Sequence, residues 1–314
     1  MFDAEKFVEE AVEKLRKEVK GKAIIAVSGG VDSSVAAKIG SIALGKNLVA
    51  VYVDTGLMRK GESEFVKNLY QKMNLNFRFV DAGREFLDAL KGVANPEEKR
   101  KIIGEKFIRI FEKVAGEERA EYLIQGTIAP DWIESGGGLR DTIKSHHNVG
   151  GLPENIRLTV VEPLRDLYKD EVRKVARYLN LEVAERQPFP GPGLAVRVLG
   201  EIDEEKVNIV REACAIVEEE IDKAWKDGRI DKPWQYFAVL LPARSVGVRG
   251  DIRAYGYTIA IRSVDSIDAM TAAYSKLPHD LLEKMATRIT NEIEEVNRVV
   301  YDISNKPPAT IEWE

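Results

Sequence analysis

Residues 23–39 of this chain read AIIAVSGGVDSSVAAKI: an apolar run, a turn with two glycines, and a second apolar run. The first run is typical of a buried strand and the second of a helix, so the glycines mark a sharp turn between them. Gly29 and Gly30 let the backbone come close to an oxyanion, and the first N–H groups of the following helix point to the same place. This segment therefore predicts a cradle for phosphate.

The other side chains of this loop fit the same interpretation. Ser28, Ser33 and Ser34 add hydroxyl donors around Val31, and Asp32 brings a carboxylate beside the phosphates. A carboxylate there needs a cation, most simply Mg²⁺. The loop lacks the lysine of the common nucleoside-triphosphatase pattern, which favours a reaction other than terminal phosphate transfer. It resembles the pyrophosphatase loop of enzymes that cleave ATP between the α and β phosphates, where the loop holds pyrophosphate.

Composition limits the class of protein. The chain has 314 residues, of which 44% are hydrophobic, so it is long enough for two globular domains. Its single cysteine, Cys214, excludes an internal disulfide and lies in a helical pattern that suits a core thiol. The formal net charge of -5 argues against a nucleic-acid partner, and no apolar run reaches membrane-spanning length. We therefore expect a cytoplasmic protein without nucleic-acid or membrane partners.

The first half of the chain alternates between strand and helix patterns. Strands are expected at residues 23–27, 48–53, 77–80 and 122–124, and helices at residues 31–43, 62–73 and 96–114. Asn95 is a suitable cap for the last of these helices, with Pro96 in its first turn. The alternation predicts an α/β fold with a doubly wound parallel sheet, whose ligands bind at the carboxyl ends of the strands.

The second half reads as a different kind of domain. Residues 187–193 (QPFPGPG) interrupt all regular structure, which predicts a junction between a domain of residues 1–187 and one of residues 188–314. Beyond the junction we expect helices at residues 204–226 and 279–296 and strands at residues 237–241, 257–261 and 298–303. The second domain is therefore expected to be a smaller α+β domain.

Polar residues follow two of the expected strands and continue into a long loop. Val53 begins a loop that can close over a nucleotide base, and Gly126 and Thr127 follow the fourth strand. The long loop at residues 127–157 is typical of either a functional lid or a disordered segment. Its acids Asp131 and Glu134 could also be ordinary solvated side chains.

Lys144 lies in this same loop and is the first catalytic candidate. A lysine on a closing loop can supply the positive charge that the phosphate loop lacks, and it would stabilise the departing pyrophosphate.

Five separated motifs carry a resemblance to a known family. They read QGTIAPDWIE at residues 125–134, IKSHHNVGGL at 143–152, QPFPGPGL at 187–194, SVGVRGD at 245–251 and KPPATIEWE at 306–314. Together they resemble GMP synthetase, and more narrowly the ATP pyrophosphatase subunit of its two-subunit form. The resemblance implies an adenine nucleotide α-hydrolase-like sheet domain and a second domain that dimerises and binds xanthosine monophosphate (XMP).

The resemblance also implies a reaction and its residues. In this family the C2 oxygen of XMP attacks the α-phosphate of ATP, and ammonia then displaces AMP to leave GMP. Asp32 would lie near Mg²⁺, and Lys144, Asp131 and Glu134 would complete the adenylylation site. The contacts to XMP would be Arg100, Gln235, Asp251, Lys306, Ile311 and Glu312. A separate glutamine amidotransferase subunit would supply ammonia, and a homodimer is expected.

Two other interpretations remain open from the sequence. NAD synthetase also adenylylates an oxygen and admits ammonia, and the phosphate loop alone does not separate the two; the KPPATIEWE tail argues against it. A non-catalytic ATP-binding sensor could use the same sheet without turnover, because fold alone does not decide function. The sensor interpretation predicts no XMP site and no need for Lys144.

Overall fold

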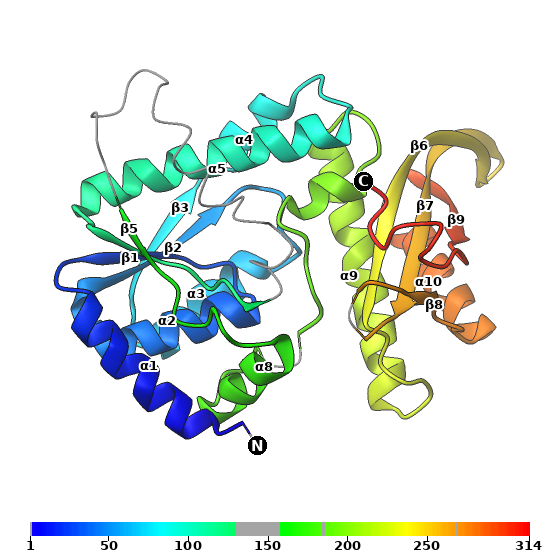
Figure 1. The fold of residues 1–314 in the computed structure, drawn as a ribbon. Helices are drawn as coiled ribbons and strands as arrows, with labels where there is room; N and C mark the ends of the chain where they lie inside the picture. Colours follow the sequence, from blue (N-terminus) through cyan, green and yellow to red (C-terminus); the bar gives the residue numbers. More distant parts are fainter. Residues whose placement is uncertain (1, 130–157, 184–185, 268) are drawn as a thin grey trace. The chain divides into compact units, whose positions relative to one another are not determined.

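The computed structural model describes residues 2–129, 158–183, 186–267 and 269–314, and its chain forms two compact units (Figure 1). The first unit comprises Met1–Asp54, Gly61–Ala82 and Glu105–Arg186. The second comprises Thr55–Lys60, Gly83–Gly104 and Gln187–Glu314. Each unit contains one β-sheet and its own buried core.

The first unit is built on a parallel sheet of five strands in the order β3-β2-β1-β4-β5. The strands are β1 (Ala23–Ala26), β2 (Leu48–Asp54), β3 (Asn76–Asp81), β4 (Tyr122–Ile124) and β5 (Thr159–Val161). The chain adds β2 and β3 on one side of β1, and then β4 and β5 on the other. The switch point, where such sheets bind ligands, therefore lies at the carboxyl ends of the neighbouring strands β1 and β4. The predicted doubly wound α/β fold is confirmed.

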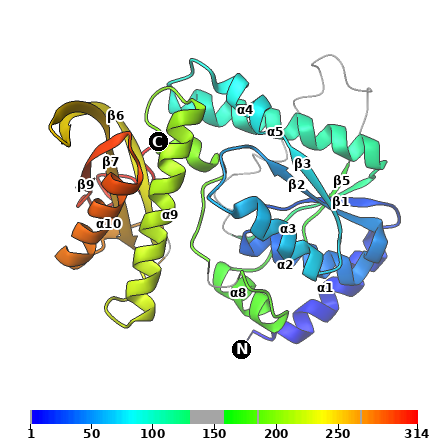
Figure 2. The ribbon, with the colours of Figure 1, turned by 180° about the vertical axis from the view of Figure 1, so that it is seen from behind.

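Helices cover both faces of this sheet. They are α1 (Ala4–Glu18), α2 (Val31–Leu44), the short 3-10 helix η1 (Gly45–Asn47), α3 (Glu62–Lys72), α8 (Lys169–Tyr178) and the part of α5 (Pro96–Glu118) from Glu105 onward. Both views show α1, α2 and α8 together on one face, and that part of α5 on the other (Figures 1 and 2). Because both faces are covered, strands such as β1 are almost wholly apolar and buried, as in Ile24 and Ile25.

The second unit combines a mixed sheet with helices. Its strands are β6 (Gln235–Arg249), β7 (Ile252–Asp265), β8 (Ala273–Tyr274) and β9 (Val296–Tyr301), and its helices are α4 (Gly83–Leu90), the 3-10 helix η2 (Gly193–Arg197), α9 (Glu204–Lys226) and α10 (His279–Glu292). β6 and β7 form a long antiparallel hairpin, and β9 pairs in parallel with β7. α9 packs on β6 and α10 on β9, which confirms the α+β architecture.

The structure corrects several expected boundaries. The helix expected at residues 279–296 ends at Glu292, because Ile293 is extended and β9 already begins at Val296. The strands expected at residues 237–241 and 257–261 are only the apolar centres of β6 and β7, whose outer ends carry polar residues. The short elements α4, β5 and β8 were not anticipated, because too few residues carry each pattern.

Two smaller expectations are also met. Asn95 caps α5, since its Oδ1 accepts the N–H groups of Glu97 and Glu98 at 3.0 and 3.1 Å. Cys214 is a buried core thiol on α9, and burial raises its pKa. Within the described ranges, no helix has both the length and the apolar character needed to cross a membrane.

Candidate active site

The loop between β1 and α2 has the backbone that the glycines predict. Gly29 has a φ of +73°, a conformation that residues with a side chain rarely adopt. A Cβ added there would also lie 2.7 Å from Cγ2 of Val66, so the loop packs too closely on α3 for any larger residue. Gly30 is the N-cap of α2 and has no side chain with which to cap it. The first N–H groups of α2 therefore face the end of the loop without a capping side chain from this residue.

Serine hydroxyls close this loop into a ring. The Ser28 N–H donates to the Ser33 hydroxyl at 3.3 Å, and the Ser33 hydroxyl donates to the Gly30 carbonyl at the same distance. The Gly30 N–H donates to Ser28 Oγ at 3.3 Å. Such a loop has its shape before any ligand arrives, which lowers the entropy cost of holding an anion.

The Ser34 hydroxyl points into the protein core. It lies 3.1 Å from the hydroxyl of Tyr70, and Ser34 has no exposed surface. Burial raises the pKa of Tyr70 to about 12, so its phenol stays protonated and can take part in that hydrogen bond. The Ser34 hydroxyl therefore bonds within the core, whereas the hydroxyls of Ser28 and Ser33 bond to each other and to the loop backbone on the exposed side.

Asp32 lies in the first turn of α2 and has two differently placed oxygens. Its Oδ2 accepts a bond from Lys169 Nζ at 2.5 Å. Its Oδ1 is buried and has no hydrogen-bond partner among the described residues. A buried carboxylate oxygen without a partner is costly, and a hard cation is a suitable partner for it. In the described part of the chain, no group of three or more acidic, histidine or cysteine side chains could hold a metal, so a cation here needs further oxygens from a ligand.

Lys169 was not anticipated from the sequence. It is the first residue of α8 and lies 137 positions from its partner Asp32. The only local sign of a special role is that a lysine stands at the start of a helix, where the macrodipole favours acidic side chains. It brings a positive charge to the lysine-free loop from another part of the first unit.

The end of β4 lies against the start of α2. A Cβ on Gly126 would lie 3.1 Å from the carbonyl carbon of Asp32 and 3.1 Å from the N of Ser33, which explains why glycine occupies this position. Thr127 follows it and is half-buried, whereas the side chain of Val53 is buried in β2. The structure thus brings Gly126 and residues 28–34 together. Asp131, Glu134 and Lys144 lie outside the described residues.

An ion pair that the sequence did not suggest lies behind the loop. Arg186 donates through Nη1 and Nη2 to the two carboxylate oxygens of Glu62, at 3.0 and 2.7 Å. The same Nη1 donates to the carbonyl of Gly29 at 3.1 Å. No local sequence pattern predicts this ion pair, because the two residues are 124 positions apart.

A second polar cluster lies in the other unit, around the carboxy-terminal tail of residues 302–314. Arg197 donates through Nε and Nη2 to the carboxylate of Glu312 at 3.1 and 2.9 Å. Gln235 Nε2 donates to the same carboxylate at 2.9 Å. Arg197 and Gln235 are 1% and 4% exposed, so these bonds are shielded from water. Two of the predicted XMP contacts, Gln235 and Glu312, therefore touch each other.

A buried arginine and a half-buried lysine hold the rest of the tail. Arg262 has no exposed surface and donates to the carbonyls of Ser304 at 2.5 Å and Thr310 at 3.0 Å. Lys306 Nζ donates to the carbonyl of Ala269 at 2.9 Å. The side chain of Ile311 is buried as well. The tail is consequently fixed along its length, which is unusual for a chain end.

The remaining two predicted XMP contacts lie in different places. Arg100 donates to the main-chain oxygen of Glu314, next to the buried Lys99, which pairs with the Glu314 carboxylate. Burial lowers the pKa of Lys99, and Glu314 opposes this effect. Asp251 is exposed at the turn between β6 and β7, separated from Gln235 by the length of β6, up to about 45 Å for an extended strand. Within one chain the structure does not bring Asp251 to the tail.

Two family models match separate parts of the chain. A family model described as GMP synthase C terminal domain matches residues 219–313, and one described as NAD synthase matches residues 2–110. A glutamine-hydrolyzing GMP synthase subunit of Methanopyrus kandleri is 62% identical over 318 aligned residues, which cover 100% of both chains. The protein of the same name from Methanocaldococcus jannaschii is 59% identical, again over 100% of both. This chain belongs to that family of GMP synthase subunits.

Membership in this family makes the chain a GMP synthase subunit, a ligase that uses ATP. The NAD synthase match covers the segment with the phosphate loop, which the two families share. The NAD synthetase interpretation is less supported, because full-length relatives carry the GMP synthase name. Among solved structures, NMN synthetase from Francisella tularensis aligns with a TM-score of 0.48 and 16% identity, covering 73% of this chain and 88% of that chain.

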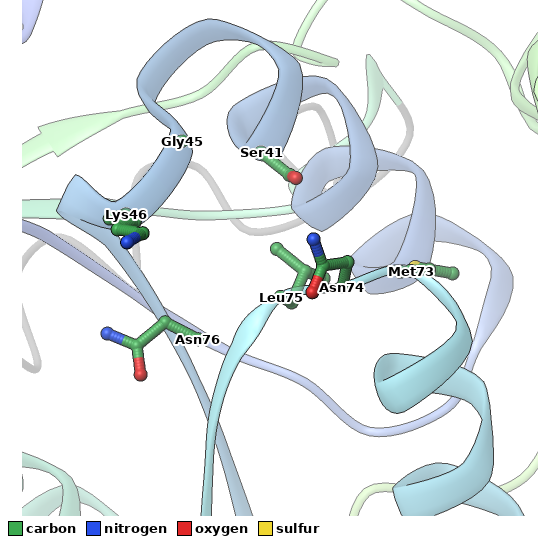
Figure 3. Close-up of a pocket in the computed structure, with 7 residues that line it drawn as sticks. All are labelled: Ser41, Gly45, Lys46, Met73, Asn74, Leu75 and Asn76. Carbon is green, nitrogen blue, oxygen red and sulfur yellow. The ribbon is translucent and has the colours of Figure 1, made fainter.

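One sizeable cavity of this GMP synthase subunit lies away from the phosphate loop. It measures about 640 Å³ and is lined by Ser41, Gly45, Lys46, Met73, Asn74, Leu75 and Asn76 (Figure 3). These residues lie where α2 and α3 end and where β2 and β3 begin, which is the amino-terminal edge of a parallel sheet. The phosphate loop lies at the opposite, carboxyl edge, so the cavity is not part of the candidate active site.

Proposed function

We propose that this GMP synthase subunit converts XMP, ATP and ammonia to GMP in two steps. The C2 oxygen of XMP attacks the α-phosphate of ATP, which forms adenylyl-XMP and releases pyrophosphate. Ammonia then attacks C2, the C2–O bond breaks, and the oxygen leaves as part of AMP. Neither step needs a nucleophile from the protein, so the chain's task is to orient the reactants and stabilise the charge that develops.

The phosphate loop is the observation that carries this proposal. Its ring of serines, its glycine backbone and the uncapped start of α2 form an anion site at the sheet's switch point. The loop lacks a lysine of its own, and Lys169 lies next to Asp32 instead. We assign residues 28–34 and Lys169 to pyrophosphate, with the Ser34 hydroxyl left out of the contacts because it faces Tyr70 in the core. Val53, Gly126 and Thr127 are assigned to the rest of ATP.

Asp32 fits a magnesium ion because its Oδ1 is buried without a partner among the described residues. Mg²⁺ bound there would neutralise phosphate charge, and phosphate oxygens and water would complete its ligands. Lys144, Asp131 and Glu134 remain our proposed residues for the adenylylation step itself.

The tail cluster is our proposed XMP site. Arg100, Gln235, Lys306, Ile311 and Glu312 combine positive charge, amide and carboxylate groups with one apolar side chain, which suits a nucleotide with a phosphate and a polar base. Asp251 could reach such a site only from a second copy of the chain, because β6 separates it from the tail within one chain.

A homodimer is consistent with this assignment. Exposed apolar side chains gather at the turn end of the β6–β7 hairpin, where Val246, Val248, Ile252 and Tyr255 are 44%, 72%, 75% and 72% exposed. Such a patch on a protein surface is typical of an interaction site. We therefore assign dimerisation and XMP binding to residues 188–314, joined at the XMP site by Arg100, and ATP pyrophosphatase activity to residues 1–187.

We further propose that a separate glutamine amidotransferase supplies the ammonia. The names of the relatives include glutamine hydrolysis and describe each chain as one subunit. Cys214 is buried in the core, with its pKa raised, so it is unsuited to act as a glutaminase nucleophile in this chain. A cytoplasmic location stays a prediction from the composition.

The proposal is tested with the purified chain, ATP, Mg²⁺, ammonium and XMP, and products separated by chromatography. AMP, pyrophosphate and GMP should form in equal amounts. Inosine monophosphate is the control, because it lacks the C2 oxygen that must be activated. ATP consumption with inosine monophosphate, or ATP binding without any GMP formation, would contradict the proposed reaction; the latter result would favour the sensor interpretation.

A further inference from the structure

Arg186 touches the phosphate loop directly. Its Nη1 donates to the Gly29 carbonyl at 3.1 Å. The Gly29 carbonyl and the Gly30 N–H belong to one planar trans peptide, so they point in opposite directions. Holding the carbonyl therefore also fixes the direction of the Gly30 N–H, which here bonds to Ser28 Oγ. A peptide between two glycines has little steric restraint of its own, so such a contact has an unusually large effect on it.

The guanidinium of Arg186 is itself held on two sides. Glu62, the first residue of α3, accepts both of its terminal nitrogens in a bidentate pair. The ring of Phe65 lies under it, with the guanidinium carbon 4.2 Å from the ring centroid. Planar pairing and stacking together define the orientation of a guanidinium, which an ammonium group could not achieve.

Charge gives the pair a second effect on the site. Glu62 is only 3% exposed, and its Oε1 lies 3.1 Å from where a Cβ on Gly29 would be. An unneutralised carboxylate that close behind the loop would repel the phosphates that the loop binds, because screening by water is weak there. Arg186 cancels that charge while keeping its own Nη1 on the loop.

We propose that Arg186, oriented by Glu62, is a positioning residue that sets the phosphate loop for pyrophosphate. The proposal rests on the assignment of residues 28–34 to pyrophosphate made above. It predicts that the pair controls the affinity for ATP and pyrophosphate and leaves the affinity for XMP unchanged. A pair that only stabilised the fold would not distinguish between these ligands.

The chain offers a closely matched control. Lys72 and Glu182 form an ion pair at 2.9 Å, and they join α3 to the same segment before residue 186. Both side chains are exposed, at 65% and 61%, and their bond to each other does not involve the phosphate loop. Replacing Lys72 by Met therefore removes an ion pair between the same two parts of the chain without touching Gly29.

The experiment titrates magnesium pyrophosphate and, separately, ATP into the full chain by calorimetry, and measures KM for XMP in the GMP assay. Arg186→Lys keeps a charge opposite Glu62 but lacks the fork that reaches both Glu62 and Gly29. We expect it to weaken pyrophosphate and ATP binding about tenfold, a loss of about 1.4 kcal/mol. KM for XMP should change less than about twofold, as should all three values in Lys72→Met. Glu62→Gln should weaken pyrophosphate binding about threefold, a smaller effect, because the loss of the bidentate pair that orients the guanidinium outweighs the favourable positive charge that it leaves uncancelled.

Two results would overturn this inference without affecting the proposed function. The first is that Arg186→Lys and Lys72→Met bind pyrophosphate equally well. The second is that Arg186→Lys weakens the binding of XMP as much as the binding of ATP. If Arg186→Lys does not fold, Glu62→Gln decides by the same two criteria. An unmodified chain that binds no pyrophosphate would instead contradict the proposed function, so the two failures are distinguishable.

Discussion

The phosphate loop and the carboxy-terminal tail handle their polar groups in opposite ways. In the loop, Asp32 Oδ1 is buried without a partner among the described residues, and α2 begins without a side-chain cap. In the tail, the carboxylate of Glu312 is already bound by Arg197 and Gln235. The loop is thus prepared for a ligand that brings its own charge. A ligand at the tail must compete with bonds that the protein makes with itself.

The two regions also differ in how they carry charge. Burial acts to lower the pKa of Arg197, but the carboxylate of Glu312 opposes it, so the pKa is raised and the guanidinium stays charged. The tail is therefore held by permanent, mutually compensating charges. The loop depends on main-chain N–H groups and hydroxyls, which carry no net charge and leave the charge balance to the ligand.

The largest expected effect tests whether the tail is held by its own charges. Arg197→Met leaves the carboxylate of Glu312 without its main cation and should lower the free energy of unfolding by about 3–5 kcal/mol. Denaturation in urea measures it. The control, Arg229→Met, removes an exposed pair with Asp280 and should cost less than about 1 kcal/mol. If the two variants lose the same free energy of unfolding, the tail is not held by its buried charges and does not differ from the loop in this respect.

The next effect tests whether the loop's unpaired oxygen serves a ligand and not the fold. Asp32→Asn should lower turnover about 10²- to 10³-fold, because the amide cannot supply the charge that a cation needs. The midpoint of thermal unfolding should fall only slightly, since Oδ1 bonds to nothing in the described part of the protein and the ion pair of Oδ2 with Lys169 is partly exposed. Asp88→Asn, at an exposed acid in α4, is the control for turnover. If Asp32→Asn lowers the stability strongly and leaves turnover normal, Asp32 serves the fold and does not bind a cation.

A smaller effect separates the ligands of the two regions. Lys306→Ala should weaken XMP binding by about 1.5–3 kcal/mol, the value of one charge-assisted hydrogen bond, and leave ATP binding unchanged. Titration of each nucleotide measures this, with the exposed Lys276→Ala as control. Equal weakening of both nucleotides would show that Lys306 does not belong to an XMP site.

The smallest effect concerns the one hydroxyl among Ser28, Ser33 and Ser34 that faces inward. Ser34→Ala removes a partner of the buried Tyr70 hydroxyl and should cost about 1 kcal/mol of stability. Because the hydroxyl is turned away from the ligand side, pyrophosphate affinity should stay within about twofold of the unmodified chain. If Ser34→Ala loses more free energy of pyrophosphate binding than free energy of unfolding, the Ser34 hydroxyl contacts the ligand and this interpretation is wrong.

The sequence predicted the loop well because its determinants are local. The strand, the glycine turn and the start of α2 all lie within residues 23–39, and Gly29 does have the positive φ that the turn requires. The helices at residues 31–43 and 204–226 were also found, since each repeats an apolar pattern over several turns. Hydrophobic periodicity and turn chemistry are properties of neighbouring residues, so one sequence suffices to read them.

The charges that surround both regions were not predictable in this way. Lys169 and Arg186 meet the loop from 137 and 157 positions away, and Lys99 meets Glu314 across 215 positions. A lone arginine or lysine in a helix or turn looks like any solvated charge, and no local pattern names its partner.

The amino-acid order of this chain was enough to predict a parallel α/β sheet, a glycine turn between its first strand and the following helix, and a tail of unusual composition, because short-range geometry and solvation act on neighbours. Which oxygen of Asp32 lacks a partner, and which cations are buried around Glu312, depends on folding, because helices and strands from distant parts of the chain must pack before those atoms meet. Electrostatic pairing in a buried site is a property of that packing and not of any segment alone.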